Sequence, residues 1–277
     1  IYLVWNQAEL IWFAFALMLD QAVVAVLFLI MYRWKIEWFP FFSFTWTQAK
    51  KLMRDAWPLI FAGMVVSVYM KIDQVMLKEM LNTKAVGVYA AAVKLCEAWY
   101  FVPTAVIASL FPAVIEARKN SELLYYERVQ KLYDLMVWGS VAVAIPSTLL
   151  ADWIILILYG ADFKEAADVL RIYIWAGVFV SLGIASSKCL IAENLQRYSF
   201  YITALGAVLN ISCNYWLIPI YGIKGAAFAT LVAQVTVCFL SLSFFKKTRH
   251  NFLLVAKSLS IISAYKRTFQ RILIRGR

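Results

Sequence analysis

Seven long apolar stretches decide what this chain can fold into. Each holds about 20 mainly apolar residues, the length that a helix needs to cross about 30 Å of hydrocarbon. Backbone groups in lipid must be hydrogen-bonded within their own segment, and the sequence lacks the short alternating strands of a lipid barrel. The expected fold is therefore all-α, a polytopic bundle of about seven transmembrane helices. The predicted spans run near 10–32, 56–80, 86–115, 132–158, 167–191, 200–218 and 225–245.

The composition argues against an ordinary soluble protein. Apolar residues make up 64% of the chain and charged residues only 16%, whereas soluble domains are roughly 45–50% apolar and about 25% charged. The net charge of +11 fits basic loops beside anionic lipid, so no nucleic-acid partner is expected. The four cysteines lie in apolar runs and His250 is the only histidine, which predicts neither a metal site nor a cofactor.

Basic residues alternate between the loops and indicate the orientation of the chain. The first loop, the third loop and the tail are rich in Lys and Arg, while the loops between them are short and carry few. The positive-inside rule therefore predicts a cytoplasmic C-terminus. Pro58 is expected in the first turn of the second span, and Pro219 to Gly222 in a tight turn between the last two. The tail over 253–274 is interpreted as either a surface helix or a disordered segment.

Charged side chains inside the predicted spans are the main functional signal. Lys71, Asp73 and Gln74 interrupt the second span, and Lys94 and Glu97 lie on one face of the third. At about 1.5 Å per residue, both lysines lie about 14 Å from the outer end of their helices. Each buried charge costs about 2.5–3.5 kcal/mol. Two interpretations stay open: an ion-pair network that locks two helices, or a polar cavity whose cations face an anionic substrate.

Three further polar residues are candidates for the same site. Asp20 lies in the middle of the first span, and Asn210 and Asn214 share one face of the sixth. We find no nucleophile paired with a histidine and no glycine-rich phosphate loop, so no catalytic residues are predicted and the chain is not expected to be an enzyme.

Six short motifs follow one another between residues 54 and 245. They are Trp57-Pro58-Leu59, Lys71-Ile-Asp73-Gln74, Val86-Gly87-Val-Tyr89, Leu158-Tyr159-Gly160, Asn210-Ile-Ser-Cys-Asn214 and Tyr221-Gly222-Ile-Lys-Gly225. With these motifs the chain resembles the C-terminal portion of bacterial O-antigen and polysaccharide flippases, which belong to the multidrug, oligosaccharidyl-lipid and polysaccharide exporter superfamily.

The resemblance implies a domain organisation. Residues 1–32 would be the last span of a truncated first lobe and 33–55 a basic cytoplasmic loop. Residues 56–246 would form the C-terminal lobe of about six spans, and 247–277 a basic cytoplasmic tail.

The resemblance also implies a function. The protein would move an undecaprenyl-diphosphate-linked oligosaccharide from the inner to the outer leaflet of the bacterial inner membrane by alternating access. Its expected partners are this lipid-linked oligosaccharide, membrane lipids and the polysaccharide polymerase machinery. An anionic diphosphate fits the cations Lys71 and Lys94.

Two other functions stay open. The first is a cation-coupled multidrug exporter of the same superfamily, in which Asp73 and Asp20 would be coupling residues. The second is a glycosyltransferase or polymerase that acts on the same lipid carrier. It would need a large outer loop with catalytic carboxylates, and the sequence has no such loop.

Overall fold

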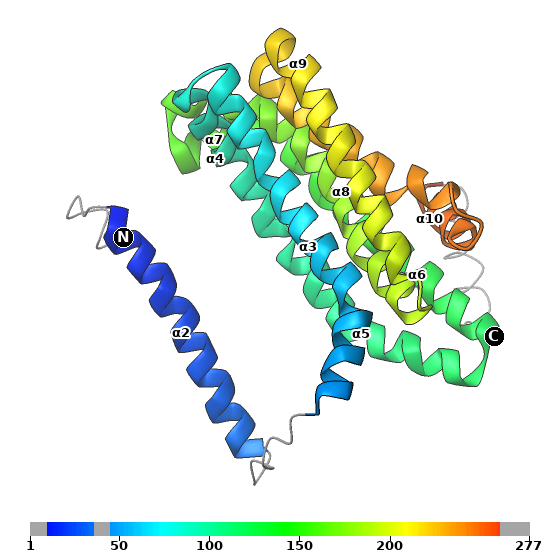
Figure 1. Ribbon diagram of the computed structural model, residues 1–277. Coiled ribbons are helices and arrows are strands. Elements are labelled where there is room, and N and C mark those ends of the chain that lie inside the picture. The colour runs from blue at the N-terminus through cyan, green and yellow to red at the C-terminus, as the bar shows by residue number, and fades with distance from the viewer. Residues whose placement is uncertain (1–9, 36–44, 261–277) are drawn as a thin grey trace, which may run out of the picture. The chain divides into compact units, whose positions relative to one another are not determined.

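A computed structural model describes residues 10–35 and 45–260 of the chain, and every described secondary-structure element is helical. Clustering of contacts separates two compact units, Ile1–Arg54 and Asp55–Arg277. The described elements, labelled in Figure 1, are α2 (Leu10–Lys35), α3 (Trp46–Met80), α4 (Thr83–Trp99), α5 (Phe101–Asn120), α6 (Glu122–Leu149), α7 (Ala151–Tyr159), α8 (Ala166–Ala192), α9 (Gln196–Cys238) and α10 (Arg249–Leu259), with short 3-10 helices at Ala161–Phe163 and Leu240–Ser243. The predicted all-α polytopic bundle is confirmed.

Within the described residues, four helical stretches are long and apolar enough to cross a membrane: Thr83–Asn120, Glu122–Leu149, Ala166–Ala192 and Gln196–Ser243. The last one contains two predicted spans, because the chain reverses direction inside α9 at Gly222, whose φ is 59°. Figure 1 shows the two legs of this hairpin side by side. The first two predicted spans lie within α2 and α3.

Two predicted spans are each broken into two helices. The third divides into α4 and α5 at Tyr100. Pro103 follows three residues later, and a proline removes an N–H and crowds the carbonyl four residues before it, which here belongs to Trp99. The fourth divides into α6 and α7 at Leu150. Gly160, with φ 83°, then ends α7, because glycine adopts a positive φ at a helix end without strain.

The expected position of Pro58 is wrong. Because α3 begins at Trp46, Pro58 lies in the helix interior and not in its first turn. The apolar stretch that predicts this span covers only the later part of the helix. The polar and basic residues before it continue the same helix, beginning beside Thr45, whose hydroxyl donates to Gln48 Oε1 at 2.8 Å.

Helix α8 is the centre of the second unit and packs against α4, α6 and α9. The α9 hairpin closes tightly because it carries small residues. A Cβ atom on Gly225 would lie 2.3 Å from the Leu217 carbonyl oxygen, and one on Gly206 would lie 1.9 Å from Val237 Cγ2. These glycines let the second leg of α9 pack directly against the first.

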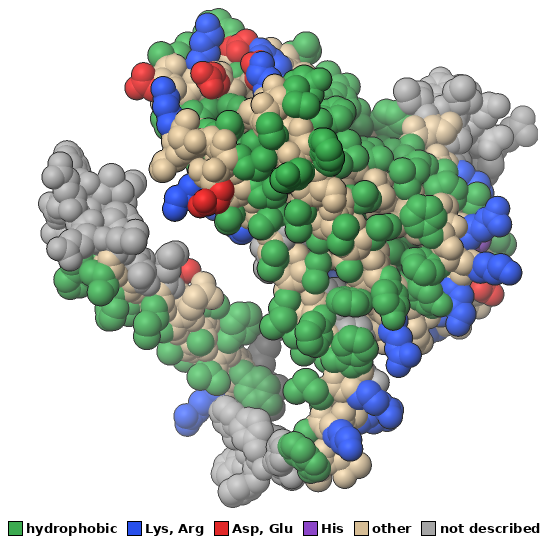
Figure 2. Space-filling view, turned by 45° about the horizontal axis from the view of Figure 1, so that its top comes forward, with side chains coloured by type: hydrophobic (Ala, Val, Ile, Leu, Met, Phe, Trp, Pro, Cys, Tyr) green, Lys and Arg blue, Asp and Glu red, His purple; other side chains and the backbone are tan. Residues whose placement is uncertain are grey.

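The surface of this unit is mostly apolar. Large hydrophobic side chains such as Trp153, Ile157 and Trp216 are more than two-thirds exposed. In Figure 2 hydrophobic side chains cover most of the visible face of the unit, and charged side chains gather toward its margins. An apolar belt of this kind suits a lipid environment and would be costly in water.

The beginning of the predicted tail helix has a fixed position. Helix α10 lies against α6, where Gln130 Nε2 donates to the Leu254 carbonyl at 3.1 Å and to the Ser258 hydroxyl at 2.7 Å. Tyr133 also donates to Asn251 Oδ1 at 3.3 Å. The tail therefore starts as a helix packed on the bundle. Residues 261–274 of the predicted segment lie outside the described residues.

Candidate functional site

A buried carboxylate on α3 joins this helix to three other helical segments of the second unit. Asp73 on α3 is only 2% exposed. Its Oδ2 accepts hydrogen bonds from Tyr89 on α4 at 2.8 Å and from Thr230 on the second leg of α9 at 2.5 Å. Its Oδ1 accepts one from Asn214 on the first leg at 2.6 Å. We call Asp73, Tyr89, Asn210, Asn214 and Thr230 the Asp73 cluster.

The Asn82 cap brings α3 and α4 together at this point. Asn82 Oδ1 accepts from the Ala85 N–H at 2.9 Å and starts α4 directly after α3 ends. Asp73 and Tyr89 lie about equally far from this turn, so the antiparallel helices place them side by side.

The Asp73 cluster is rich in oxygen and contains no cationic side chain. Asn210 Oδ1 accepts from Asn214 at 3.2 Å, and Asn210 Nδ2 lies 3.5 Å from the Thr230 hydroxyl. Asn214 Oδ1 is buried without a hydrogen-bond partner. No Lys or Arg among the described residues forms an ion pair with Asp73. A carboxylate buried in this way needs a proton or a bound cation to offset its charge.

A second group of charged residues lies nearby on α3 and α4, and we call it the lysine pair. Lys71 Nζ lies 3.8 Å from Glu97 Oε1, and Lys94 Nζ lies 3.9 Å from Glu97 Oε2. The lysine side chains are 55% and 69% exposed, and that of Glu97 is 22% exposed. One carboxylate thus faces two ammonium groups, which leaves a net charge of +1 on an open surface.

The predicted site residues therefore divide into groups. Lys71, Lys94 and Glu97 come together at one surface, and Asp73, Asn210 and Asn214 come together in the interior. The remaining two predicted residues join neither set of contacts. Gln74 is partly buried on α3, and Asp20 lies in the other compact unit, where Gln21 donates to it at 3.2 Å.

Sequence reasoning missed Tyr89 and Thr230 as site residues. Both lie in or next to the short motifs, but a tyrosine and a threonine inside an apolar helix carry no charge that would single them out. Their role becomes visible only through contacts that span 16 and 157 positions of the chain.

A third group of charged residues lies near the N-terminal end of α8. Arg171 forms ion pairs with Asp152 on α7 and with Asp168, and Lys224 on α9 pairs with Asp168 at 2.7 Å. Two cations face two carboxylates, so the charges of this group, which we call the Asp168 network, cancel. The network ties α7, α8 and α9 together.

Comparison with known proteins identifies what the chain resembles. Residues 1–118 match the family described as polysaccharide biosynthesis protein. The predicted resemblance to polysaccharide flippases is confirmed. Because the match begins at residue 1, it also includes the first span and the basic loop after it.

Relatives of this flippase-like chain come from archaea and bacteria. It is 28% identical over 176 residues to a probable flippase AglR of Haloferax volcanii, a match that covers 60% of the chain and 36% of the relative. It is 25% identical to a probable low-salt glycan biosynthesis flippase Agl15 of the same organism, over 60% of the chain and 35% of the relative. It is 18% identical to a capsular polysaccharide biosynthesis protein CapF of Staphylococcus aureus, over 69% of the chain and 48% of the relative.

The chain spans about a third of the length of the two flippases that it matches. No solved structure matches it. The apolar helices and the membrane-protein relatives make this a multi-pass membrane protein.

Proposed function

We propose that this protein moves a phosphate-linked glycan lipid across the membrane by alternating access, driven by a small cation that binds at the Asp73 cluster. The cargo is an undecaprenyl-diphosphate-linked oligosaccharide such as an O-antigen or other polysaccharide unit. The membrane is the bacterial inner membrane, with the basic tail in the cytoplasm and polysaccharide polymerase as a partner. Residues 1–32 then end one lobe, and 56–246 form the second.

The lysine pair is the observation that carries this proposal. Lys71 lies nine residues before the end of α3 at Met80, and Lys94 lies eleven residues after the start of α4 at Thr83. At about 1.5 Å per residue, both cations are therefore about 14–17 Å from that end of the helices. An uncompensated cation at this depth is costly against lipid, but is stable against water or an anionic cargo. A diphosphate carries the charge and the acceptor oxygens that two ammonium groups bind.

The Asp73 cluster supports ion coupling. Asp73 and the side-chain oxygens of Asn210, Asn214 and Thr230 supply the oxygen ligands that hard cations prefer. A proton on Asp73 would neutralise the carboxylate equally well. The cluster is too enclosed for a sugar, so it suits the driving ion and not the cargo.

The two alternative functions fit these observations less well. A multidrug exporter could use the same ion site, but a surface with excess positive charge disfavours the cationic drugs that such a site would expel. A glycosyltransferase would need an extramembrane domain. In the described residues, the connections at the outer end are short, such as the two residues between α3 and α4.

Substitution of the lysine pair tests the proposed function. In the intact protein, Lys71→Ala with Lys94→Ala should lower export of lipid-linked glycan about tenfold or more, since each charge-assisted contact contributes about 1.5–3 kcal/mol. Lys78→Ala with Lys84→Ala is the matched control, because these lysines are exposed near the same helix turn. Export is measured as surface glycan in cells that lack their own flippase. Normal surface glycan from the Lys71/Lys94 variant would refute the assignment.

A further inference from the structure

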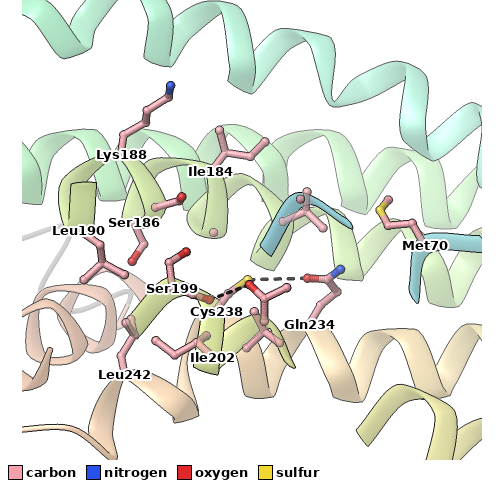
Figure 3. Close-up of a pocket in the computed structure, with 16 residues that line it drawn as sticks. Met70, Ile184, Ser186, Lys188, Leu190, Ser199, Ile202, Gln234, Cys238 and Leu242 are labelled. Atoms are coloured by element: carbon pink, nitrogen blue, oxygen red, sulfur yellow. Dashed lines mark hydrogen bonds between the residues drawn. The ribbon is translucent and has the colours of Figure 1, made fainter. Parts of the chain in front are cut away.

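A separate cavity, which no residue of the lysine pair lines, lies between α3, α8 and both legs of α9. Its volume is about 400 Å³, within the range of about 300–1,000 Å³ that is typical of small-ligand sites. The wall is mainly apolar, and Figure 3 shows its side chains converging from these helices. The apolar part is formed by Met70, Val180, Ile184, Leu190, Ile202 and Leu242.

Two polar residues of the cavity wall, Thr203 and Cys238, are bonded within α9, whereas the buried Ser186 hydroxyl in the same wall has no hydrogen-bond partner among the residues that the structure describes. Thr203 donates its hydroxyl hydrogen to the Ser199 carbonyl at 2.8 Å, and Cys238 Sγ lies 3.7 Å from Gln234 Oε1. Figure 3 shows both contacts as dashed lines. The described lining contains no carboxylate and is mainly apolar, so the wall suits a hydrocarbon chain better than a cation.

A cation marks one rim of the cavity. Lys188 is exposed near the end of α8 and forms no ion pair with any residue that the structure describes. In Figure 3 its ammonium points away from the apolar wall. From Lys188 to Val180, the cavity follows eight residues of α8, about 12 Å at the rise of an α-helix. A charged head group at Lys188 would therefore leave room for a chain that runs along the helix.

We infer that this cavity binds one acyl chain of an anionic glycerophospholipid of the surrounding membrane, with the lipid phosphate at Lys188. Basic sites between transmembrane helices on the cytoplasmic side recognise anionic head groups in this way. Arg197 lies close to the same end, at the start of α9, where it lines a smaller cavity with Trp57 and Phe200. In the proposed orientation this end faces the cytoplasmic leaflet. The site goes beyond the proposed transport function, because it binds a lipid of the membrane and not the cargo.

Gly63 offers a way to block the cavity without disturbing the fold. It lines the cavity, is exposed, and a Cβ placed on it would meet no atom within 4 Å. Gly63→Trp should therefore fill the opening without a clash. Gly87 on α4 has the same open surroundings and does not line this cavity, so Gly87→Trp is the matched control.

Native mass spectrometry of the purified protein tests the inference directly. The bound fraction is measured with phosphatidylglycerol, phosphatidylcholine or a polyprenyl phosphate added at equal concentrations. We expect phosphatidylglycerol to bind more than phosphatidylcholine, and Lys188→Gln to weaken its binding about fivefold, while Lys78→Gln has no effect. Gly63→Trp should abolish this binding and Gly87→Trp should preserve it.

Three results would overturn the inference. The first is equal binding of both phospholipids that Lys188→Gln leaves unchanged. The second is phosphatidylglycerol binding that survives in Gly63→Trp, because the lipid would then bind elsewhere. The third is polyprenyl phosphate displacing phosphatidylglycerol from the wild type but not binding to Gly63→Trp, which would assign the cavity to the cargo. Since no transport is measured, failure here is distinct from failure of the lysine-pair experiment.

Discussion

Two carboxylates on neighbouring helices have opposite surroundings in this protein. Asp73 is 2% exposed and is held by the hydroxyls of Tyr89 and Thr230 and the amide of Asn214. Glu97 is 22% exposed on its side chain and lies between the ammonium groups of two lysines. The first carboxylate has neutral partners and no open space, and the second has an excess of positive charge on an open surface.

Because of this difference, the two sites suit different ligands. A closed, oxygen-rich site can exchange only a proton or a small cation, whereas an open, cationic surface can receive a large anion. Asp73 and Lys71 are two residues apart on α3, so they lie on nearly opposite sides of the same helix. In the proposed transport cycle, a movement of α3 on ion binding at Asp73 would also shift Lys71 and so couple the ion to the cargo.

Asp73→Asn should have the largest effect, because it removes the charge from the closed site and preserves its shape. Ion-driven export should fall about a hundredfold, the upper range of typical coupling between sites. The asparagine oxygen can still accept from Tyr89 and Thr230, and only the hydrogen bond from Asn214 is lost, so stability should fall by only about 0.5–1.5 kcal/mol. Export is measured in vesicles with an imposed proton or sodium gradient.

Asp73→Ala is the control for this experiment, because it leaves Tyr89 and Asn214 without their buried partner. It should lower stability by about 1–3 kcal/mol as well as transport. An Asp73→Asn protein that still exports at the wild-type rate and still responds to the gradient would show that the closed site does not couple to transport.

Glu97→Gln should have a smaller effect, in the direction of tighter cargo binding. It raises the net charge of the lysine pair from +1 to +2 and leaves both lysines in place. Binding of a diphosphate lipid should strengthen about two- to fivefold, since a partly exposed ion pair contributes at most about 1 kcal/mol. The measurement is a binding isotherm at low and high salt, with a steeper salt dependence expected for the variant.

Asp168→Asn is the control for Glu97→Gln, because it removes the same charge from the Asp168 network, which lies apart from the lysine pair. It should leave cargo binding unchanged and weaken only the contacts among Lys224, Arg171 and α8. If Asp168→Asn strengthened binding as much as Glu97→Gln, the effect would reflect the total charge of the protein and not the lysine pair.

The sequence predicts the helices and the depth of the charges better than it predicts their partners. Counting residues from the helix ends predicts that Lys71 and Lys94 lie at about one level. It did not separate the outward-facing lysines from the inward-facing Asp73, which depends on how α3 is rotated against α8 and α9. The closed site also needs Thr230, which reaches Asp73 only because α9 reverses direction at Gly222. Such long-range pairing has no local signal in apolar helices.

Glu193 offers the smallest expected effect and tests directly how neutral hydrogen-bond donors affect the pKa of a half-buried carboxylate. It follows α8 outside the candidate spans and accepts from Tyr125 at 3.2 Å and from Asn251 on α10 at 3.1 Å. Burial raises the pKa of Glu193, and the two hydrogen bonds and the charges of Arg118 and His250 only partly oppose it. A carboxyl group with a raised pKa stabilises the folded state below its ordinary pKa of about 4.3, and this contribution is lost as pH rises through the higher folded value.

Packing of α10 should therefore loosen slightly as the pH rises from about 4 toward neutrality. Hydrogen exchange of the α10 amides, corrected for the intrinsic effect of pH, should show less protection at the higher pH. Glu193→Gln should remove this dependence because its side chain does not titrate. Histidines change charge in an overlapping range, so His250→Gln serves as the control and should keep most of the dependence. A pH response that disappears with His250 and persists in Glu193→Gln would show that neutral donors and burial do not govern this carboxylate. It would also weaken the inference that the buried carboxylate of Asp73, held by neutral donors, needs a proton or a bound cation.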